Sequence, residues 1–361
     1  MGTYVNPGTE RFKTSRISKF YVDKSMIISL LNDKVESDDR FLCVSRPRRF
    51  GKTMAANMIA AYYSKGCDSH EIFSDLKISK DPTFEDNINR YTVIKLDING
   101  AATGKGDKTI VQYYNENVMT ELMKVYPDVA LSSDMSIAKA LVSIYEETGD
   151  KFVFIIDEYD LPIRDGKYAK ESDDYIAFLV SLFKSEETNY TIALAYLTGI
   201  MPIIREKVQS KLNNFTEYTM IDADDMAPFM GFTEEEVKDL SLKVGMDYEE
   251  VKHWYDGYNL KGLEIYSPKS VITAITKKQC ADYWSQTSSY EAVTDYISLD
   301  LDGLKDDVVS MLSGDRVEVS TSFYRNTMSF DTKDDVLTYL IHLGYLTYDS
   351  GDGTCRIPNN E

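Results

Sequence analysis

The sequence has few of the residues that build metal centres and disulfide scaffolds. Its 361 residues include three histidines, four cysteines and two tryptophans. The cysteines are too far apart for a disulfide ladder or for CxxC metal-binding spacing. The histidines are isolated from one another, which favours structural roles for them over metal ligation or base catalysis. The cysteines are Cys43, Cys67, Cys280 and Cys355, and the histidines are His70, His253 and His342.

Long apolar runs and excess positive charge are also missing. No apolar run reaches 18 residues, and the N-terminus has no apolar segment of the signal-peptide type, so we expect a cytoplasmic protein that does not enter a membrane. The chain has 40 Lys and Arg against 59 Asp and Glu, a formal net charge of -19. This charge argues against general electrostatic binding of nucleic acid. This chain alone therefore does not support nucleic acid as a partner.

One stretch that is present has the pattern of a phosphate-binding P-loop, or Walker A motif. Residues 41–45 are apolar and predict a strand, while residues 54–63 are rich in helix formers. Between them, Gly51-Lys52-Thr53 stands at the expected helix start, where unpaired backbone N–H groups and the helix dipole favour an anion. Lys52 would reach the outer phosphates of a nucleotide, and the Thr53 hydroxyl would complete a magnesium shell.

This loop departs from the usual G-x-x-x-x-G-K-[ST] pattern at its beginning. Arg46 stands where the first glycine belongs, and Pro47 beside it has no N–H. The phosphate cradle should be formed mainly by N–H groups nearer the helix, from Arg49 to Met54, so neither change removes a necessary donor. The loop is also a local basic spot, better suited to a compact polyphosphate than to a long duplex. The residues expected to bind the nucleotide are Arg46, Pro47, Arg48, Arg49, Phe50, Gly51, Lys52, Thr53 and Met54.

Strands and helices are expected to alternate along residues 1–225. A polar arm at 1–19, expected to be irregular, precedes predicted strands at 41–45, 91–98, 151–158, 191–198 and 217–221. Helical spacing predicts helices at 108–126, 136–147, 173–186 and 202–211. The alternation implies an α/β fold of the P-loop NTPase type, with a mostly parallel sheet flanked by helices.

The pattern changes after about residue 225, which predicts a second domain. Length alone favours two or three domains, because 361 residues exceed the usual limit for one core. Residues 226–361 are expected to be mostly helical. They end in a helix at 334–343 and a small hairpin, which is compatible with a winged helix. The predicted domains are therefore 1–225, a P-loop ATPase domain, and 226–361, a helical region ending in a winged-helix-like subdomain.

The second part of the predicted chemistry is the pair Asp157-Glu158, which has the pattern of a Walker B motif. Both follow a continuous apolar run, typical of a strand buried on both faces, and ligands of parallel sheets bind at the carboxyl ends of such strands. Asp157 would hold magnesium, directly or through water. Glu158, on the other side of the strand end, would orient or deprotonate the attacking water. In isolation, each motif is better explained as ordinary surface or strand-end polarity, but their order and context favour nucleotide binding.

Two further positions complete the predicted catalytic set, which is Lys52, Glu158, Thr198 and an arginine. Thr198 ends the strand expected to lie between the two motif strands, and it would sense the outer phosphate by a hydrogen bond, unless it only caps the strand. Arg205 is the first candidate for an arginine finger by position, with Arg164 and Arg49 behind it. A solvated surface arginine is the alternative for each.

Several motifs, taken in order, resemble those of the bacterial AAA-ATPase-like domain family, which is related to archaeal-type and signalling P-loop ATPases. The most specific are residues 21–25 (YVDKS), 46–53 (RPRRFGKT) and 156–162 (IDEYDLP). In that family an arginine at the position of Arg46 is normal. Similarities to later motifs of the family continue along nearly the whole chain, at 197–200, 212–214, 231–233, 254–258, 283–284, 343–346 and 357–359.

The resemblance implies a nucleotide-dependent protein with ATP and Mg²⁺ as cofactors. Members of the family often continue past the IPN motif, here 357–359, into a PD-(D/E)XK nuclease-like domain. The sequence stops at Glu361, so it is expected to be either a truncated piece or a member without that domain, and no nuclease activity is assigned to it.

The sequence leaves more than one function open. The first hypothesis is magnesium-dependent ATP hydrolysis that drives rearrangement between the ATPase domain and the C-terminal region. The alternative is a nucleotide-gated switch with negligible turnover, whose C-terminal region recruits a protein partner or self-associates. A P-loop kinase is a weaker third hypothesis, since kinases seldom need a glutamate beside the metal-binding aspartate. Phe20 or Tyr21 could stack on the adenine, but a core role is equally compatible with each.

Overall fold

The structure, a computed structural model, describes residues 1–203, 212–284, 297–298, 300–321 and 330–361. It divides into two units. The first is Met1–Val44, Lys52–Gly199 and Lys207–Thr216, and the second is Ser45–Gly51, Ile200–Glu206 and Glu217–Glu361. The second unit therefore includes residues 45–51, which precede the P-loop lysine. The division into functional domains at 225/226 stays a prediction.

Buried strands form the centre of the first unit and determine where the functional side chains lie. Five strands make one sheet in the order β2-β3-β4-β1-β5. Strands β2, β3 and β4 run parallel, as predicted, with Asp97 opposite Asp157 and Asp157 opposite Thr198. Strand β4 lies between β3 and β1, which confirms the predicted extra strand between the two motif strands. The bounds are β1 Phe41–Ser45, β2 Thr92–Asp97, β3 Phe152–Asp157, β4 Ile192–Gly199 and β5 Thr216–Tyr218.

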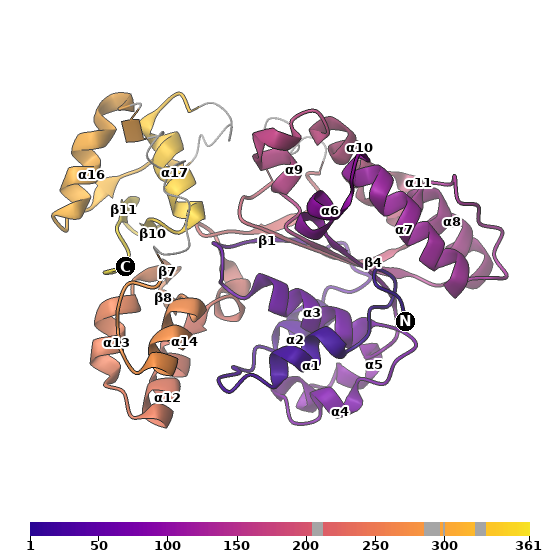
Figure 1. Ribbon diagram of the computed structural model, residues 1–361, viewed down its shortest axis with the longest axis horizontal. Helices are drawn as coiled ribbons and strands as arrows, with labels where there is room; N and C mark the ends of the chain where they lie inside the picture. The colour runs from indigo at the N-terminus through magenta and orange to yellow at the C-terminus, as the bar shows by residue number, and fades with distance from the viewer. Residues whose placement is uncertain (204–211, 285–296, 299, 322–329) are drawn as a thin grey trace. The chain divides into compact units, whose positions relative to one another are not determined.

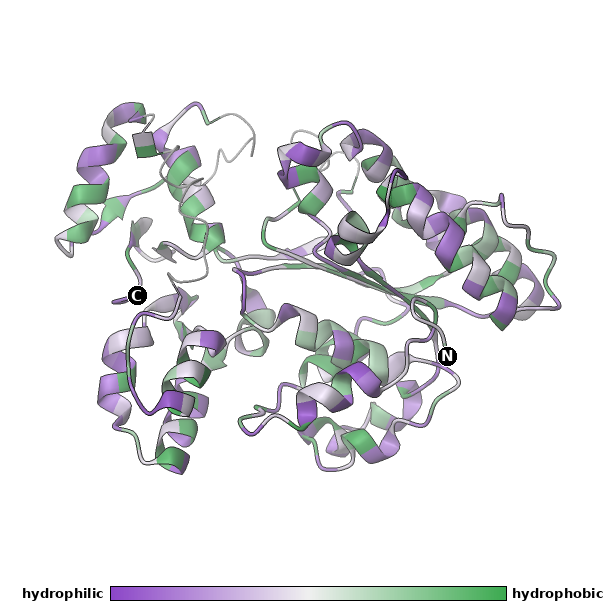
Figure 2. Ribbon diagram, in the orientation of Figure 1, coloured by the Kyte–Doolittle hydropathy of each residue, from purple (hydrophilic) through white to green (hydrophobic). Residues whose placement is uncertain are grey.

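Helices cover both faces of this sheet, as buried parallel strands require. In Figure 1, helices α1 to α5 lie on one side of it and α6 to α11 on the other. The strands are coloured as hydrophobic along most of their length in Figure 2, while the helices carry hydrophilic residues on their outer faces. The bounds are α1 Glu10–Arg16, α2 Ile27–Asn32, α3 Lys52–Tyr63, α4 His70–Phe73, α5 Phe84–Asn87, α6 Ile98–Gly104, α7 Ile110–Val125, α8 Ile137–Thr148, α9 Leu161–Arg164, α10 Ser172–Phe183 and α11 Glu186–Asn189.

The N-terminal arm differs from the prediction, because residues 1–19 are not irregular. Val5 pairs with Ile94 of β2 in an antiparallel bridge, and the Asn6 N–H donates to the Val93 carbonyl at 2.8 Å. The Glu121 carboxylate on α7 accepts three backbone N–H groups of the arm, from Thr3, Tyr4 and Val5. Helix α1 follows. These partners are about 90 to 120 residues away in sequence, so local polarity could not reveal them.

Two other predicted elements also change. The helix predicted at 173–186 ends at Phe183, and a separate short helix, α11, follows it. The strand predicted at 91–98 ends earlier, at Asp97, because Ile98 already belongs to α6, which Asp97 caps through its side chain. The predicted helix at 202–211 falls largely outside the described residues.

The second unit combines two small antiparallel sheets with helices. The sheets have the orders β6-β8-β7 and β10-β11-β9. A hydrophobic cluster joins residues of both sheets and of α17, including Tyr258, Ile265, Leu340 and Cys355. The helix and hairpin predicted near the end are present, and their description as a winged helix stays a prediction. The bounds are β6 Phe232–Thr233, β7 Tyr258–Leu260, β8 Leu263–Tyr266, β9 Val317–Glu318, β10 Thr347–Asp349, β11 Thr354–Arg356, α12 Glu234–Val244, α13 Tyr248–Tyr255, α14 Pro268–Lys277, α16 Leu304–Leu312 and α17 Lys333–Leu343.

The C-terminal residues pack against the segment 254–258, so two separate motifs of the sequence meet in this unit. A Cβ added at Gly257, which has φ +124°, would overlap the Pro358 carbonyl oxygen. The Glu361 side chain accepts the N–H groups of Tyr283 and Trp284 at 3.0 and 3.1 Å.

Candidate active site

The predicted chemistry gathers at the carboxyl ends of β3 and β4 and at the start of α3. Parallel pairing places Asp157 directly opposite Thr198. Helix α3 begins at Lys52, where the sequence predicted a helix start. We call Lys52, Thr53, Asp157, Glu158 and Thr198 the strand-tip cluster. All five belong to the first unit.

Thr53 lies near Asp157, since its side chain is one of the groups that lower the pKa of the Asp157 carboxyl. Asp157 is 3% exposed, and its Oδ1 atom is buried without a hydrogen-bond partner. Burial raises the pKa of Asp157, against the lowering effects of the Thr53 side chain and of the Lys95 and Lys52 charges. A buried carboxylate oxygen with no partner is costly, and a cation would satisfy it.

Lys52 is a buried cation surrounded by carboxylates. Burial lowers the pKa of its ammonium group to about 8, while the charges of Asp160, Asp157 and Glu158 act in the opposite direction. The side chain therefore stays mostly protonated at neutral pH. It offers a positive charge with little water around it, where electrostatic attraction to an anion is strong.

Glu158 has an unusual backbone conformation as well as an acidic environment. Its φ is +56°, a region that non-glycine residues seldom adopt and that is often found at functional sites. The next residue, Tyr159, donates its N–H to the Thr198 carbonyl at 3.1 Å, which fixes this turn to the end of β4. Burial, together with the Asp157 and Asp160 charges, raises the pKa of the Glu158 carboxyl.

Thr198 lies at the end of β4 with its hydroxyl buried. The residue is fully buried, and Oγ1 has no hydrogen-bond partner in the described structure. A threonine that only capped the strand would use its hydroxyl within the protein. The geometry thus leaves the hydroxyl available to a group that is not part of the described chain.

The structure adds charged residues that sequence reasoning did not assign to the site. Asp160, 1% exposed, accepts an ion pair from Arg164 Nε at 2.9 Å. Both residues influence the pKa values of Lys52 and Glu158, so they lie near the cluster. Lys95 on β2 is also buried and acts on Asp157. The i, i+4 spacing of Asp160 and Arg164 directly after Glu158 was the available sequence signal, whereas Lys95 looked like an ordinary strand residue.

The other predicted nucleotide-binding residues divide into buried and exposed groups. Arg46, Pro47 and Phe50 are buried, while Arg48 and Arg49 are exposed. Arg49 and Gly51 have φ values of +71° and +92°, so the backbone turns sharply before α3. Open space surrounds the position that a Cβ of Gly51 would take. Arg205 lies outside the described residues.

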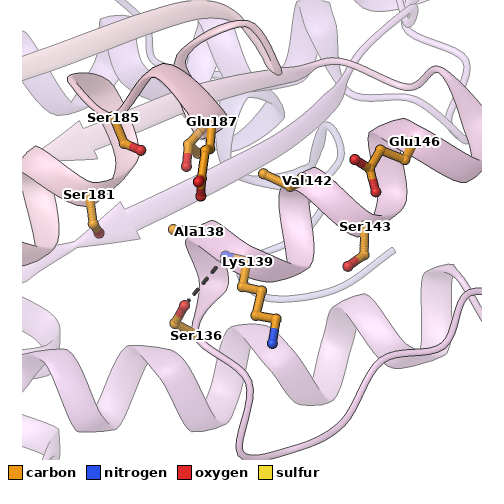
Figure 3. Close-up of a pocket in the computed structure, with 10 residues that line it drawn as sticks. Ser136, Ala138, Lys139, Val142, Ser143, Glu146, Ser181, Ser185 and Glu187 are labelled. Atoms are coloured by element: carbon orange, nitrogen blue, oxygen red, sulfur yellow. Dashed lines mark hydrogen bonds between the residues drawn. The ribbon is translucent and has the colours of Figure 1, made fainter.

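The first unit also has a groove that is separate from the strand-tip cluster. It is a groove of about 450 Å³ between α8 and the helices α10 and α11 (Figure 3). Its lining includes Lys139, Glu146 and Glu187, and the Ser136 hydroxyl at its edge already accepts the Lys139 N–H as a helix cap. The groove holds none of the strand-tip residues.

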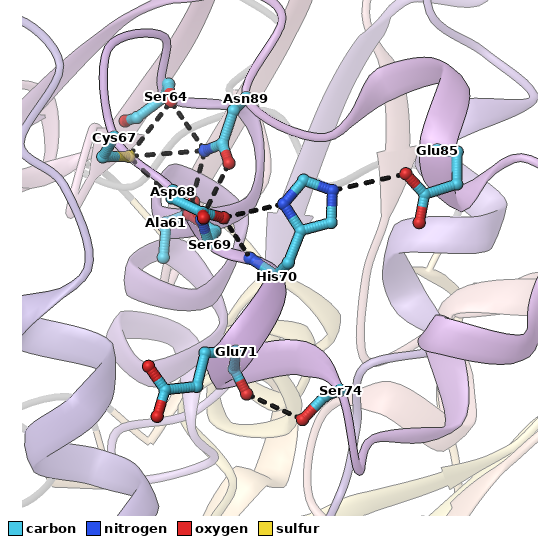
Figure 4. Close-up of polar contacts among 10 residues, drawn as sticks. All are labelled: Ala61, Ser64, Cys67, Asp68, Ser69, His70, Glu71, Ser74, Glu85 and Asn89. Atoms are coloured by element: carbon cyan, nitrogen blue, oxygen red, sulfur yellow. Dashed lines mark hydrogen bonds and ion pairs between the residues drawn. The ribbon is translucent and has the colours of Figure 1, made fainter.

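Histidines and cysteines play no part in the cluster. His70 bridges Asp68 and Glu85 on the surface (Figure 4). No disulfide forms among the four cysteines. Across the described ranges, no group of three or more His, Cys, Asp or Glu residues is placed to hold a metal ion, and no helix is both long and apolar enough to cross a membrane.

Comparison with known proteins identifies the family. The family model described as predicted AAA-ATPase matches residues 7–209, more than half of the chain and all of the strand-tip cluster. This chain belongs to that family. A curated relative from Azotobacter chroococcum mcd 1, named "Uncharacterized protein in vnfD 5'region", is 24% identical over 291 residues, which cover 77% of this chain and 52% of the relative. The chain thus spans about half the length of that relative.

Solved structures with similar backbones come from Aeropyrum pernix. Its ORC2 protein, in ADPNP and ADP complexes, is 11% identical, with 95% of this chain and 93% of that chain covered and a TM-score of 0.41. Its ORC1 protein, in complex with DNA, is 11% identical, with coverages of 100% and 95% and a TM-score of 0.30. Membership of the predicted AAA-ATPase family rests on the family model and not on these structures.

Proposed function

We propose that this predicted AAA-ATPase binds ATP with Mg²⁺ at the strand-tip cluster and hydrolyses it. One observation carries the proposal: Asp157, whose pKa both Thr53 and the buried Lys52 influence, keeps a buried oxygen without a partner. A threonine hydroxyl and a carboxylate next to a lysine are the groups that a P-loop ATPase uses to hold a metal and phosphates.

The residues present fit a magnesium ion. Mg²⁺ prefers hard oxygen ligands and usually takes one or two protein groups in addition to water and phosphate oxygens. Thr53 and the unpartnered Oδ1 of Asp157 are such ligands. Bound Mg²⁺ would neutralise charge on the outer phosphates. The raised pKa of Asp157 is consistent with a carboxylate whose counter-charge comes partly from outside the chain.

Lys52 and the backbone around it would bind the phosphates. The N–H groups from Arg49 to Met54 lie at or just before the start of α3, where the unpaired donors favour an anion. The Lys52 ammonium would then contact the outer phosphates, and its present carboxylate neighbours would be partly replaced by phosphate oxygens.

Glu158 would act as the general base. It would accept a proton from the attacking water as the water oxygen bonds to the γ-phosphorus and the bond to the β–γ bridging oxygen breaks. Its raised pKa brings it closer to the range in which a base works well. Thr198 would donate its hydroxyl to the outer phosphate. Arg164, paired with Asp160, lies near the cluster, and Arg49 and Arg205 stay sequence-based candidates for the arginine finger.

Substitution of Lys52 tests nucleotide binding directly. We expect Lys52→Ala to abolish ATP binding measured by calorimetry in magnesium buffer, because the phosphates lose their main cationic partner. Lys139→Ala is the matched control, since Lys139 lines the groove of Figure 3 in the same unit. Unchanged ATP affinity in Lys52→Ala would overturn the site assignment.

A nucleotide-gated switch with negligible turnover is the second candidate function. It is favoured by the contacts of Arg46 with Tyr218 and of Phe50 with Tyr258, which would let a nucleotide bound at residues 46–54 affect the later part of the chain without hydrolysis. Phosphate release by the wild-type protein, measured alone and with candidate protein partners, separates the two functions. Sustained release that Glu158→Gln abolishes supports the ATPase, whereas tight binding without release supports the switch.

A further inference from the structure

The loop that leads into the candidate site is anchored by side chains and backbone groups of the second unit. We call residues 45–51 the anchored loop. Arg46 within it is completely buried, and its Nη1 donates to the carbonyls of Ser45 at 2.8 Å and of Tyr218 at 3.0 Å. The guanidinium is thus bound to backbone of the second unit, which is a structural role for the residue that replaces the first glycine of the usual motif.

The next anchor is the contact between Pro47 and the end of α17. Gly344 caps that helix with φ +86°, and a Cβ added there would lie 2.7 Å from Cγ and 2.9 Å from Cβ of Pro47. The Tyr258 hydroxyl donates to the Gly344 carbonyl at 2.8 Å. Pro47, which lacks an N–H and looked like a defect in the motif, fits against this glycine.

Phe50 provides the third anchor. It is 1% exposed and belongs to the hydrophobic cluster of the second unit, with its ring 5.3 Å from that of Tyr258 in an edge-to-face arrangement. Its carbonyl accepts the Gly231 N–H at 3.1 Å. The position directly before Gly51-Lys52-Thr53 is therefore held by both a side chain and a backbone bond.

The anchors fix a short and sharply turned backbone. Arg49 and Gly51 have φ values of +71° and +92°, a region that is strained for the arginine. Only two peptide bonds separate Phe50 from Lys52, where α3 begins. A shift of Phe50 or Pro47 would consequently move the N–H groups that the proposed function assigns to phosphate.

We propose that Arg46, Pro47 and Phe50 are positioning residues whose contacts with Tyr218, Gly344 and Tyr258 set the backbone shape of the segment that leads into Lys52. The inference rests on the proposed nucleotide binding and deepens it: ATP and the packing around α17 and β7 stabilise each other. Coupling of this kind is reciprocal, so a disturbance at Gly344 must change ATP affinity, and ATP must protect the anchors.

A glycine substitution with a matched control tests the first direction. Gly344→Ala forces a methyl group against Pro47. Gly245→Ala places the same methyl at another helix C-cap of the second unit, with φ +71° and open space around it. Both variants should lower the Tm, but we expect only Gly344→Ala to weaken ATP binding, by about tenfold in calorimetry.

Hydrogen exchange on the wild-type protein tests the second direction and does not depend on how a variant folds. Saturating ATP and Mg²⁺ should slow exchange of the Gly231 amide about tenfold, because its acceptor is the Phe50 carbonyl. The Gly245 amide, bonded to Leu242 within α12, should not change.

The outcomes separate failure of this inference from failure of the proposed function. If the wild-type protein does not bind ATP, the proposed function fails. If it binds ATP but Gly344→Ala and Gly245→Ala have equal affinities, or the Gly231 amide exchanges at the same rate with and without ATP, the positioning role is wrong and the site assignment remains.

Discussion

The strand-tip cluster and the anchored loop meet at the peptide bond between Gly51 and Lys52, yet they are stabilised in opposite ways. In the cluster, Lys52 and Asp157 are buried charges, and the oxygens Asp157 Oδ1 and Thr198 Oγ1 lack partners. In the loop, Arg46 is bonded to two carbonyls and Phe50 is part of a hydrophobic core. The cluster carries buried oxygens without partners, whereas the loop combines a buried arginine that donates to two carbonyls with a ring packed in a hydrophobic cluster.

The difference shows that one sequence motif contains residues of two kinds, those that bind a ligand and those that stabilise the fold. Unsatisfied buried groups destabilise a protein unless a ligand completes them, so their presence points to binding. Well-packed residues such as Phe50 contribute to stability whether or not a ligand is bound. In the RPRRFGKT segment, Gly51-Lys52-Thr53 is thus proposed to bind the nucleotide, whereas Arg46, Pro47 and Phe50 stabilise the fold through packing and hydrogen bonds.

The largest effect is expected at Glu158. Glu158→Gln keeps the size and polarity of the side chain but removes the base, so phosphate release should fall about 10³-fold while ATP affinity changes by less than about threefold. Release measured in single turnovers and affinity measured by calorimetry check both parts. Glu187→Gln in the groove of Figure 3 is the control. Retained turnover in Glu158→Gln would remove Glu158 from the chemistry.

The pH profile of wild-type turnover gives an independent view of the same residue. A base must be deprotonated, so activity should fall as the pH decreases through the pKa of Glu158. Because burial raises that pKa, the acidic limb should lie above the ordinary glutamate value of 4.5. Glu158→Gln should lose this limb. An acidic limb at or below the ordinary value would contradict the assignment of a Glu158 carboxyl with raised pKa as the base.

The next effect concerns stability and compares the two sides of the Gly51–Lys52 bond. Phe50→Ala should lower the free energy of unfolding of the second unit by about 3–5 kcal/mol, the usual loss for a buried phenylalanine. Lys52→Ala, two residues along, should cost much less, because burial of its charge offsets its attraction to Asp157 and Asp160. Urea unfolding without nucleotide measures both. Equal losses of unfolding free energy in the two variants would contradict the division of the motif into stabilising and nucleotide-binding residues.

Sequence reasoning worked where the signal was local and failed where the partners were distant. The apolar runs ending at Asp157 and Thr198 predicted both strands and their place in the sheet, and Gly51-Lys52-Thr53 predicted the start of α3. The arm at 1–19 was predicted wrongly because its partners, Glu121 and β2, lie far along the chain. The burial of Arg46 was likewise invisible, since an arginine in a basic run normally predicts a surface.

A smaller effect is expected at Thr198. Thr198→Val removes a buried hydroxyl that has no partner, so the nucleotide-free protein should gain about 1 kcal/mol of stability, while turnover should fall about tenfold. Thr191→Val, at the residue directly before β4, is the matched control. Its hydroxyl donates to the Thr188 carbonyl at 2.7 Å, so this variant should lose about 1 kcal/mol without affecting turnover. A loss of stability in Thr198→Val would instead indicate a capping role.

The smallest effect is expected on the surface, where charged groups are solvated and a lost contact costs little. His70 contacts Asp68 at 2.7 Å and Glu85 at 3.3 Å but is about half exposed (Figure 4). Its hydrogen bond to Asp68 raises the pKa of His70 and lowers that of Asp68. The bridge should therefore stabilise the fold fully between the ordinary values of 3.8 and 6.5 and lose its effect as the pH rises through the raised pKa of His70. His70→Gln should reduce stability by no more than about 0.5 kcal/mol at pH 5.5 and less at pH 8.5, as urea unfolding would show, with ATP affinity unchanged. A larger loss, or one that grows with pH, would mean that solvent-exposed charges in this protein behave like the buried ones of the strand-tip cluster.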